Sequence, residues 1–170
     1  MTHRRREVWP AAIIAAGQAS WRVTLVVLGV VVVPGAAICT VGVVAFGPAV
    51  LGPMVVALSL FVLSSFIHEL GHAVAHVLFA DPARAIVAGR GAWASGSVVR
   101  WSLGTNADGA VAIAGPFAAM ASGLLILVLP IPFILAYPVV ALFSVHLLSL
   151  TRHAADGSQV RRAIEGDPDA

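Results

Sequence analysis

The chain has 170 residues, of which 59% are hydrophobic and 11% are charged. A soluble globular domain has about a quarter charged residues, so this composition excludes an ordinary soluble domain and indicates an integral membrane protein. The formal net charge of +2 is too small and too dispersed to suggest nucleic-acid binding. The single cysteine, Cys39, excludes an intramolecular disulfide. The length suits one compact bundle without a second large domain.

Residues 1–22 predict a short head at a membrane interface. Arginines and tryptophans stand together there, just before an apolar run, as they do at the ends of membrane spans. The residues concerned are Arg4, Arg5, Arg6, Arg22, Trp9 and Trp21. A cleaved signal peptide is the rival interpretation, but the apolar piece 11–16 is short and the sequence after it is a poor cleavage site.

Four apolar stretches are long enough to cross a bilayer as helices. They are Val23–Phe46, Met54 to about Ala80, Ala110–Leu129 and Phe133–Leu150. Gly-Pro pairs at 47–53 and prolines at 130–132 predict turns between them. The one long polar connection, 81–109, contains two short stretches of β-formers, and Gly89-Arg90-Gly91 between them predicts a turn. We therefore expect an all-α membrane protein with four transmembrane helices and a short β-containing loop between helices two and three.

The charges predict the orientation of these spans. All ten basic residues are arginines, and all lie in residues 1–22, 81–109 and 151–170, on one side of the four-span arrangement. The positive-inside rule makes that side cytoplasmic. We expect a multi-pass protein of the bacterial plasma membrane with both termini cytoplasmic. Its predicted parts are a head at 1–22, an accessory transmembrane helix at 23–46, a three-helix core at 47–157 and a cytoplasmic tail at 158–170.

The second apolar stretch ends in the motif His68-Glu69-Leu70-Gly71-His72. On a helix, residues i and i+4 lie one turn apart on the same face, so His68 and His72 can hold one metal ion, typically Zn²⁺. Glu69 then lies near the open position of the metal and can act as general base on a water there. Two helix-face histidines with a salt-bridging glutamate are the simpler alternative. Such groups at membrane depth are costly and usually functional.

Zinc in a hydrolase usually has three protein ligands, so a third must come from outside the motif. The candidates are His76, His146, His153, Asp108 and Asp156. His76 lies about 12 Å along the helix from His68 at 1.5 Å per residue, too far for one ion to bridge. His146 lies on a largely apolar face, where packing or hydrogen bonding is the simpler interpretation. Asp108 is interpreted as a solvated turn residue.

Asp156 is the favoured third ligand. Helices two and four run in the same direction, so their C-terminal ends meet on one side, near the histidine pair. His153 stays an alternative ligand, and a helix-ending Asp-Gly turn without any metal stays an alternative for Asp156 and Gly157.

The HExxH motif in one span, followed by Asp156-Gly157 after the second-next span, resembles the site-2 protease family of intramembrane zinc metalloproteases. The resemblance covers about residues 50–162, and Gly115-Pro116 is similar to a Gly-Pro motif of that family. It implies a short form without a PDZ domain, with one Zn²⁺ per chain held by His68, His72 and Asp156, and Glu69 as the catalytic residue. It also implies hydrolysis of peptide bonds near the cytoplasmic side, in a membrane-protein substrate with a single span. Strands in the 81–109 loop would lie near the substrate cleft.

The chain departs from the family pattern at two places. Ala119 stands where the family often has asparagine after the Gly-Pro motif. Ser149 and Arg152 stand where it often has an Asn-x-x-Pro element. Asparagines near a cleft can orient substrate or stabilise an oxyanion, so a catalytically inactive relative that binds membrane partners is an alternative.

A metal transporter using the motif histidines and His76 as a pathway is a further alternative. It would need polar residues along several spans, whereas here they gather at one end.

Overall fold

The computed structural model describes residues 8–21, 25, 40, 43–44, 47–48, 51–81, 85, 87–91, 96–128, 133–151 and 153–166. Most of these residues are helical, and two strands form the only sheet among them. The predicted accessory span at 23–46 and the turn at 130–132 lie almost entirely outside the described residues.

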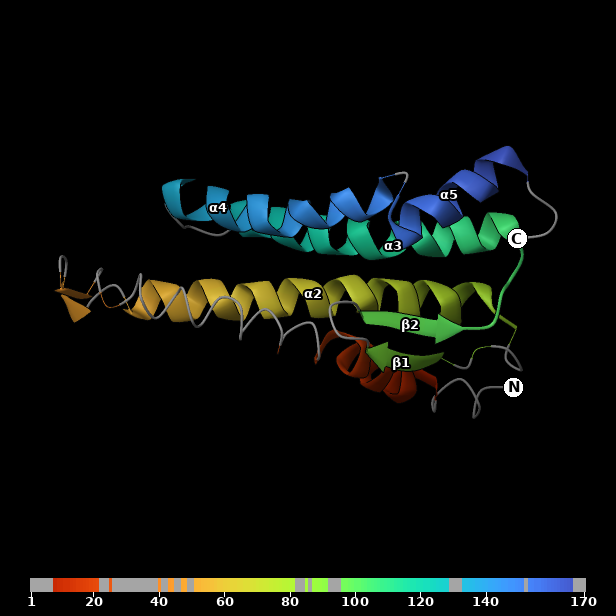
Figure 1. The fold of residues 1–170 in the computed structure, drawn as a ribbon, viewed down its shortest axis with the longest axis horizontal. Coiled ribbons are helices and arrows are strands. Elements are labelled where there is room, and N and C mark those ends of the chain that lie inside the picture. The colour runs from red at the N-terminus through yellow and green to blue at the C-terminus, as the bar shows by residue number, and fades with distance from the viewer. Residues whose placement is uncertain are drawn as a thin grey trace.

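Helix α2 (Leu51–Phe79) is the long helix that carries the HExxH motif (Figure 1). It begins three residues before the predicted start at Met54, so the second Gly-Pro pair lies in its first turn and not in a separate loop. Proline is tolerated there because an amide in the first turn has no helical partner to lose. The last turn closes with the Ala80 amide donating to the His76 carbonyl at 2.8 Å. Pro82 disfavours helix at the residue before it.

The polar connection after α2 forms the predicted β-structure. Strand β1 (Val87–Gly91) pairs antiparallel with β2 (Gly96–Arg100). The prediction of a turn at residues 89–91 is wrong, since Gly89 lies within β1 opposite Val98. A Cβ on Gly89 would overlap the Ala15 carbonyl and the Gln18 side chain. Glycine is therefore needed for close approach between this strand and the N-terminal helix.

The helical residues 8–21 and α2 enclose a small apolar core with the hairpin. Its buried members are Ala12, Ala15, Ala73 and Val87, with Val77 and Val98 packed against them. Small side chains allow the backbones to approach closely. The N-terminal helix thus holds β1, and through it β2, against the part of α2 that contains the histidines.

Helix α3 (Thr105–Leu124) is central to the bundle, since it packs against α2, α4, η3 and α5. It begins five residues before the predicted span at Ala110 and continues into a 3₁₀ segment, η2 (Leu125–Val128). The predicted fourth span, Phe133–Leu150, is confirmed as helical, divided into α4 (Phe133–Ser144) and a 3₁₀ segment, η3 (Val145–Leu150).

The C-terminal part contains one more helix, α5 (Ala155–Glu165), where the sequence suggested only a polar tail. It lies beside the start of α3 (Figure 1). A Cβ on Gly109 of α3 would approach the Ala163 Cβ to 2.5 Å, so the two helices are in close contact. Gly166, in the left-handed conformation with φ 68°, ends α5.

Two helical stretches are long and apolar enough to cross a membrane: Ser59–Phe79 and Thr105–Val128. The apolar stretch Ala136–Leu150 is shorter than such a span. Large apolar side chains are exposed on all three stretches, among them Leu63, Phe79, Phe117, Val128 and Leu148. Exposed apolar surface of this kind favours contact with lipid or another protein. The four-span arrangement and its orientation stay predictions.

Candidate metal centre

The two motif histidines point to the same place, as their spacing predicts. His68 and His72 are both 8% exposed on α2, which packs against α3. Their Nε2 atoms are 3.1 Å apart, and their rings meet edge to face with centroids 4.7 Å apart. Each histidine therefore presents the same nitrogen to a shared point.

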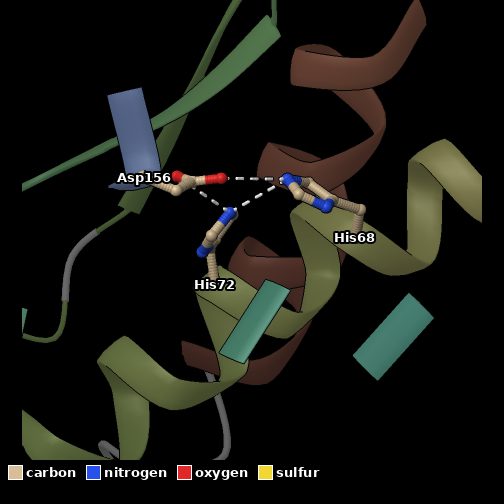
Figure 2. A group of neighbouring side chains, drawn as sticks. All are labelled: His68, His72 and Asp156. Atoms are coloured by element: carbon tan, nitrogen blue, oxygen red, sulfur yellow. Dashed lines mark hydrogen bonds and ion pairs between the residues drawn. The ribbon is translucent and has the colours of Figure 1, made fainter. Parts of the chain in front are cut away.

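Asp156 lies in the first turn of α5 and faces these two nitrogens (Figure 2). Its two carboxylate oxygens lie 3.5 Å from His68 Nε2 and 3.5 Å from His72 Nε2, one oxygen to each ring. Burial of the carboxylate opposes its ionisation, but the favourable interaction with the two histidine rings outweighs burial and holds the pKa of Asp156 below its ordinary value.

Gly157 explains how α5 can begin so close to the preceding segment. A Cβ at this position would overlap the carbonyl of Thr151 and lie 2.5 Å from that of Leu150. Only glycine fits there, so Gly157 permits the close approach that brings Asp156 to the two histidines. The alternative of a helix-ending turn is wrong, because the pair lies at the beginning of a helix.

The three side chains form a group that could hold a metal ion, since one donor atom from each lies within 4.8 Å of the others. Zinc bonds of 2.0–2.2 Å in tetrahedral geometry place two ligand atoms about 3.3–3.6 Å apart. The separations of 3.1, 3.5 and 3.5 Å are close to this range. Two imidazole nitrogens and one carboxylate are also a common donor set for Zn²⁺. The residues present therefore fit the ion.

The second ring nitrogen of His72 is occupied. His72 Nδ1 donates to the backbone carbonyl of Val111 in α3 at 2.8 Å. Because a carbonyl can only accept, Nδ1 carries the hydrogen and Nε2 keeps its lone pair for the metal group. Pro116 lies in the next turn of α3 and cannot donate to the carbonyl four residues before it. The turn of α3 that lacks this hydrogen bond is the one that contacts His72.

Gly115, the partner of Pro116 in the Gly-Pro pair, lies directly against the His72 ring. A Cβ on Gly115 would overlap His72 Nε2 and approach Cε1 to 2.5 Å. On the opposite helix, a Cβ on Gly71 would come 2.7 Å from the Ala114 carbonyl and 2.9 Å from the Gly115 Cα. These two glycines allow α2 and α3 to approach closely where the metal group lies.

Glu69 lies beside the group and is not one of its three members. The Val98 backbone donates a hydrogen bond to its carboxylate. Its Oε2 is buried without a hydrogen-bond partner in the described part of the chain. A carboxylate oxygen in this state can accept a proton or a hydrogen bond from a molecule that enters the site.

A cavity of about 250 Å³ opens onto these groups. Its walls come from α2, β2, η3 and α5. They are formed by His68, Glu69, His72, Val98, Arg100, Ser149, Ala155, Asp156 and Gln159. Ser149 therefore lies at the site.

The remaining candidate ligands lie outside the metal group. His76 is fully buried one turn beyond His72, and His153 is exposed. The His146 ring stacks on that of His68 with centroids 4.7 Å apart, and its Nε2 lies 3.1 Å from Ser64 Oγ. The interpretation of His146 as a packed, hydrogen-bonded histidine agrees with this position.

Asp108 is not the solvated turn residue that the sequence suggested. It lies in the first turn of α3, pairs with Arg100 and accepts a hydrogen bond from Ser102. Arg100 also donates to Gln159 Oε1 at 3.0 Å. This network joins β2, α3 and α5 beside the metal group. No local sequence signal predicts this network, because the pairing depends on how distant elements meet.

No protein-family model matches the chain, and no curated protein or solved structure matches it either. The resemblance to site-2 proteases therefore depends on the motif residues alone.

Proposed function

We propose that this protein is an intramembrane zinc metalloprotease of the site-2 protease type. The observation that carries the proposal is the meeting of His68, His72 and Asp156 within 4.8 Å, with Glu69 on the same cavity. The sequence motif supplies the two histidines and Glu69, a carboxylate that is not a ligand. A third ligand from α5 completes the set that a hydrolytic zinc site needs.

The residues have distinct roles in this proposal. His68, His72 and Asp156 would hold one Zn²⁺. When bound, the ion supplies Lewis-acid chemistry: it polarises a peptide carbonyl and lowers the pKa of water to about 7. Glu69 takes a proton from the attacking water and delivers it to the leaving amine. Val111 fixes the His72 tautomer through Nδ1. His146 supports the ring of His68 by stacking.

The expected substrate is a membrane protein, in keeping with the two helices that are long and apolar enough to cross a bilayer. A transmembrane helix satisfies its own backbone hydrogen bonds, so it must unwind locally before its carbonyls can enter the site. The cavity at the metal group is bordered by β2, whose residues Val98 and Arg100 contribute to its walls. A locally extended substrate could lie along that strand.

An inactive relative that binds membrane partners is the second candidate. Ala119 and Ser149 favour it, because the family often has asparagines at these two positions. The buried Glu69 carboxylate favours hydrolysis, since an inactive binding protein has no need of a base beside a metal. The two candidates therefore differ in what they require of Glu69.

Glu69→Gln is the variant that tests the proposal. Glutamine keeps the size and hydrogen-bonding shape of glutamate but cannot take up the proton. Loss of a general base typically lowers the rate about 10²–10⁴-fold. Zinc content should stay at one ion per chain, because Glu69 is not a proposed ligand. The measurement is single-turnover cleavage of single-span substrates in liposomes, with zinc content determined on both proteins.

Two results would contradict the proposal. Equal cleavage by wild type and Glu69→Gln would remove Glu69 from the mechanism. No cleavage by zinc-loaded wild type across a broad set of membrane-protein substrates would favour the inactive relative.

A further inference from the structure

A second cavity, of about 460 Å³, continues from the metal cavity along β2 and α5. The two cavities share four residues: Val98, Arg100, Ala155 and Gln159. The second cavity then extends to the start of α3 and to Arg162 of α5. A chain segment that occupied the metal cavity could therefore continue into it without leaving the surface of these elements.

Among the described residues that line the second cavity, one positively charged side chain, Arg162, is not neutralised by an ion pair. Arg100 and Asp108 form an ion pair, and Ser102 also donates to Asp108, so their charges offset one another. The Arg162 side chain has no hydrogen bond or ion pair with any other described residue. Among the described residues that line the cavity, its guanidinium carries the net charge, which is positive.

Gln159 lies one turn before Arg162 on the same face of α5. Residues three apart on a helix are neighbours on its surface, and both side chains line the cavity. Gln159 Oε1 accepts from Arg100 at 3.0 Å, so the amide group directs its oxygen toward Arg100 and keeps its N–H donors for another partner. An anion at this place would meet the guanidinium of Arg162 and the amide of Gln159 together.

We propose that this cavity is a specificity subsite that binds a carboxylate side chain of the substrate, with Arg162 as the recognition residue. Guanidinium pairs with carboxylate through two parallel hydrogen bonds. Arg162 lies six residues after Asp156, which is about 9 Å along α5 at 1.5 Å per residue. An extended chain advances about 3.3 Å per residue. The recognised Asp or Glu therefore lies about three residues from the bond that is cleaved.

This inference rests on the proposed protease function, so its test needs a measurement that does not depend on cleavage. The probe is a fluorescent single-span peptide in phosphatidylcholine liposomes, with one glutamate moved residue by residue through a glutamine background. Binding is measured to zinc-loaded full-length Glu69→Gln protein, which leaves the peptide intact. We expect glutamate at one position, or two adjacent ones, to tighten binding about tenfold over glutamine.

Arg161 supplies the matched control. It is a neighbouring arginine of α5, but its Nη1 lies 3.7 Å from the Glu165 carboxylate and it does not line the cavity. Arg162→Gln should bring the glutamate-to-glutamine ratio of affinities to one, Arg162→Lys should keep part of it, and Arg161→Gln should keep all of it. An equal loss in both glutamine variants would indicate a general charge effect and overturn the subsite.

Four further outcomes separate this proposal from others. If the Glu69→Gln protein with Arg162 intact binds all peptides with equal affinity, or binds none of them, the subsite is overturned. Arg162-dependent binding of phosphatidylglycerol vesicles without a glutamate preference would assign the cavity to lipid phosphate and also overturn it. A glutamate preference in binding without any cleavage by wild type would uphold the subsite and reject the protease. Cleavage by wild type without that preference would uphold the protease and reject the subsite.

Discussion

His72 is the residue on which the proposed metal centre depends most directly, because both of its ring nitrogens are engaged. Nδ1 donates to Val111, while Nε2 faces His68 and Asp156. A metal-ligating histidine commonly uses its second nitrogen in this way, since the hydrogen bond fixes the tautomer and the ring orientation. His68 has no such bond, for its Nδ1 is buried without a partner in the described residues. Stacking of His146 orients it instead.

Asp156→Ala should weaken zinc binding by more than the roughly 10–100-fold that loss of a supporting contact costs. The reason is that Asp156 provides the one carboxylate donor of the group. The measurement is competition with a chromophoric chelator on purified protein. His153→Ala is the control, since that exposed histidine lies three residues away and should bind zinc as wild type does. The opposite pattern would show that the third ligand has been misassigned.

At the scale of elements, α3 determines where the histidines can lie. Gly115 contacts the His72 ring, and Gly71 of α2 meets the α3 backbone. In a bilayer, small residues at helix contacts allow van der Waals packing that larger side chains would prevent. The Gly-Pro pair of α3 therefore has a structural explanation: the glycine makes room for the ring, and the proline lies in the turn beside its hydrogen bond.

Gly115→Ala should weaken zinc binding, because the added methyl group would overlap the His72 ring and displace Nε2. Gly123→Ala is the matched control in the same helix. Its Cβ would approach the Phe143 Cβ to 2.5 Å, away from the metal group. Both variants should lower the melting temperature, since overpacking costs about 1–3 kcal/mol. Only Gly115→Ala should change zinc affinity, and equal affinities in the two would contradict this role.

The sequence predicts what local spacing controls and misses what long-range contact controls. The pairing of His68 with His72 follows from helical periodicity, and the choice of Asp156 follows from the direction of helices two and four. The helix that carries Asp156 was missed because α5 is short and polar, and it packs on Gly109 of a distant helix. Gly89 was assigned to a turn because its contact with the N-terminal helix leaves no local signal.

At the scale of the whole molecule, the polar and apolar parts are separated along the bundle. The hairpin and α5 lie toward one end in Figure 1, and α4 lies toward the other. Asp156 of the metal group belongs to α5. Ser59–Phe79 and Thr105–Val128 connect the two ends and are long enough to cross a bilayer. All arginines fall in the three segments predicted to share the cytoplasmic side.

The predicted orientation can be measured with single cysteines. Arg6→Cys, Ala94→Cys and Gly166→Cys, each in a Cys39→Ala background, should resist a membrane-impermeant thiol reagent in intact cells and react after lysis. The reason is that the positive-inside rule places all three segments in the cytoplasm. Labelling of any one of them before lysis would contradict the four-span arrangement.

The histidines and the aspartate of the metal group differ in how tightly the elements that carry them are packed. The histidine side lies between two closely packed helices, with Gly71 and Gly115 at the contact and Val111 bonded to His72. Asp156 lies on α5, an eleven-residue helix that follows η3. Short elements open at lower free energy than packed core helices. Under the proposed function, motion of α5 is the route by which a substrate polypeptide would enter, and a bound ion would connect α2 with α5.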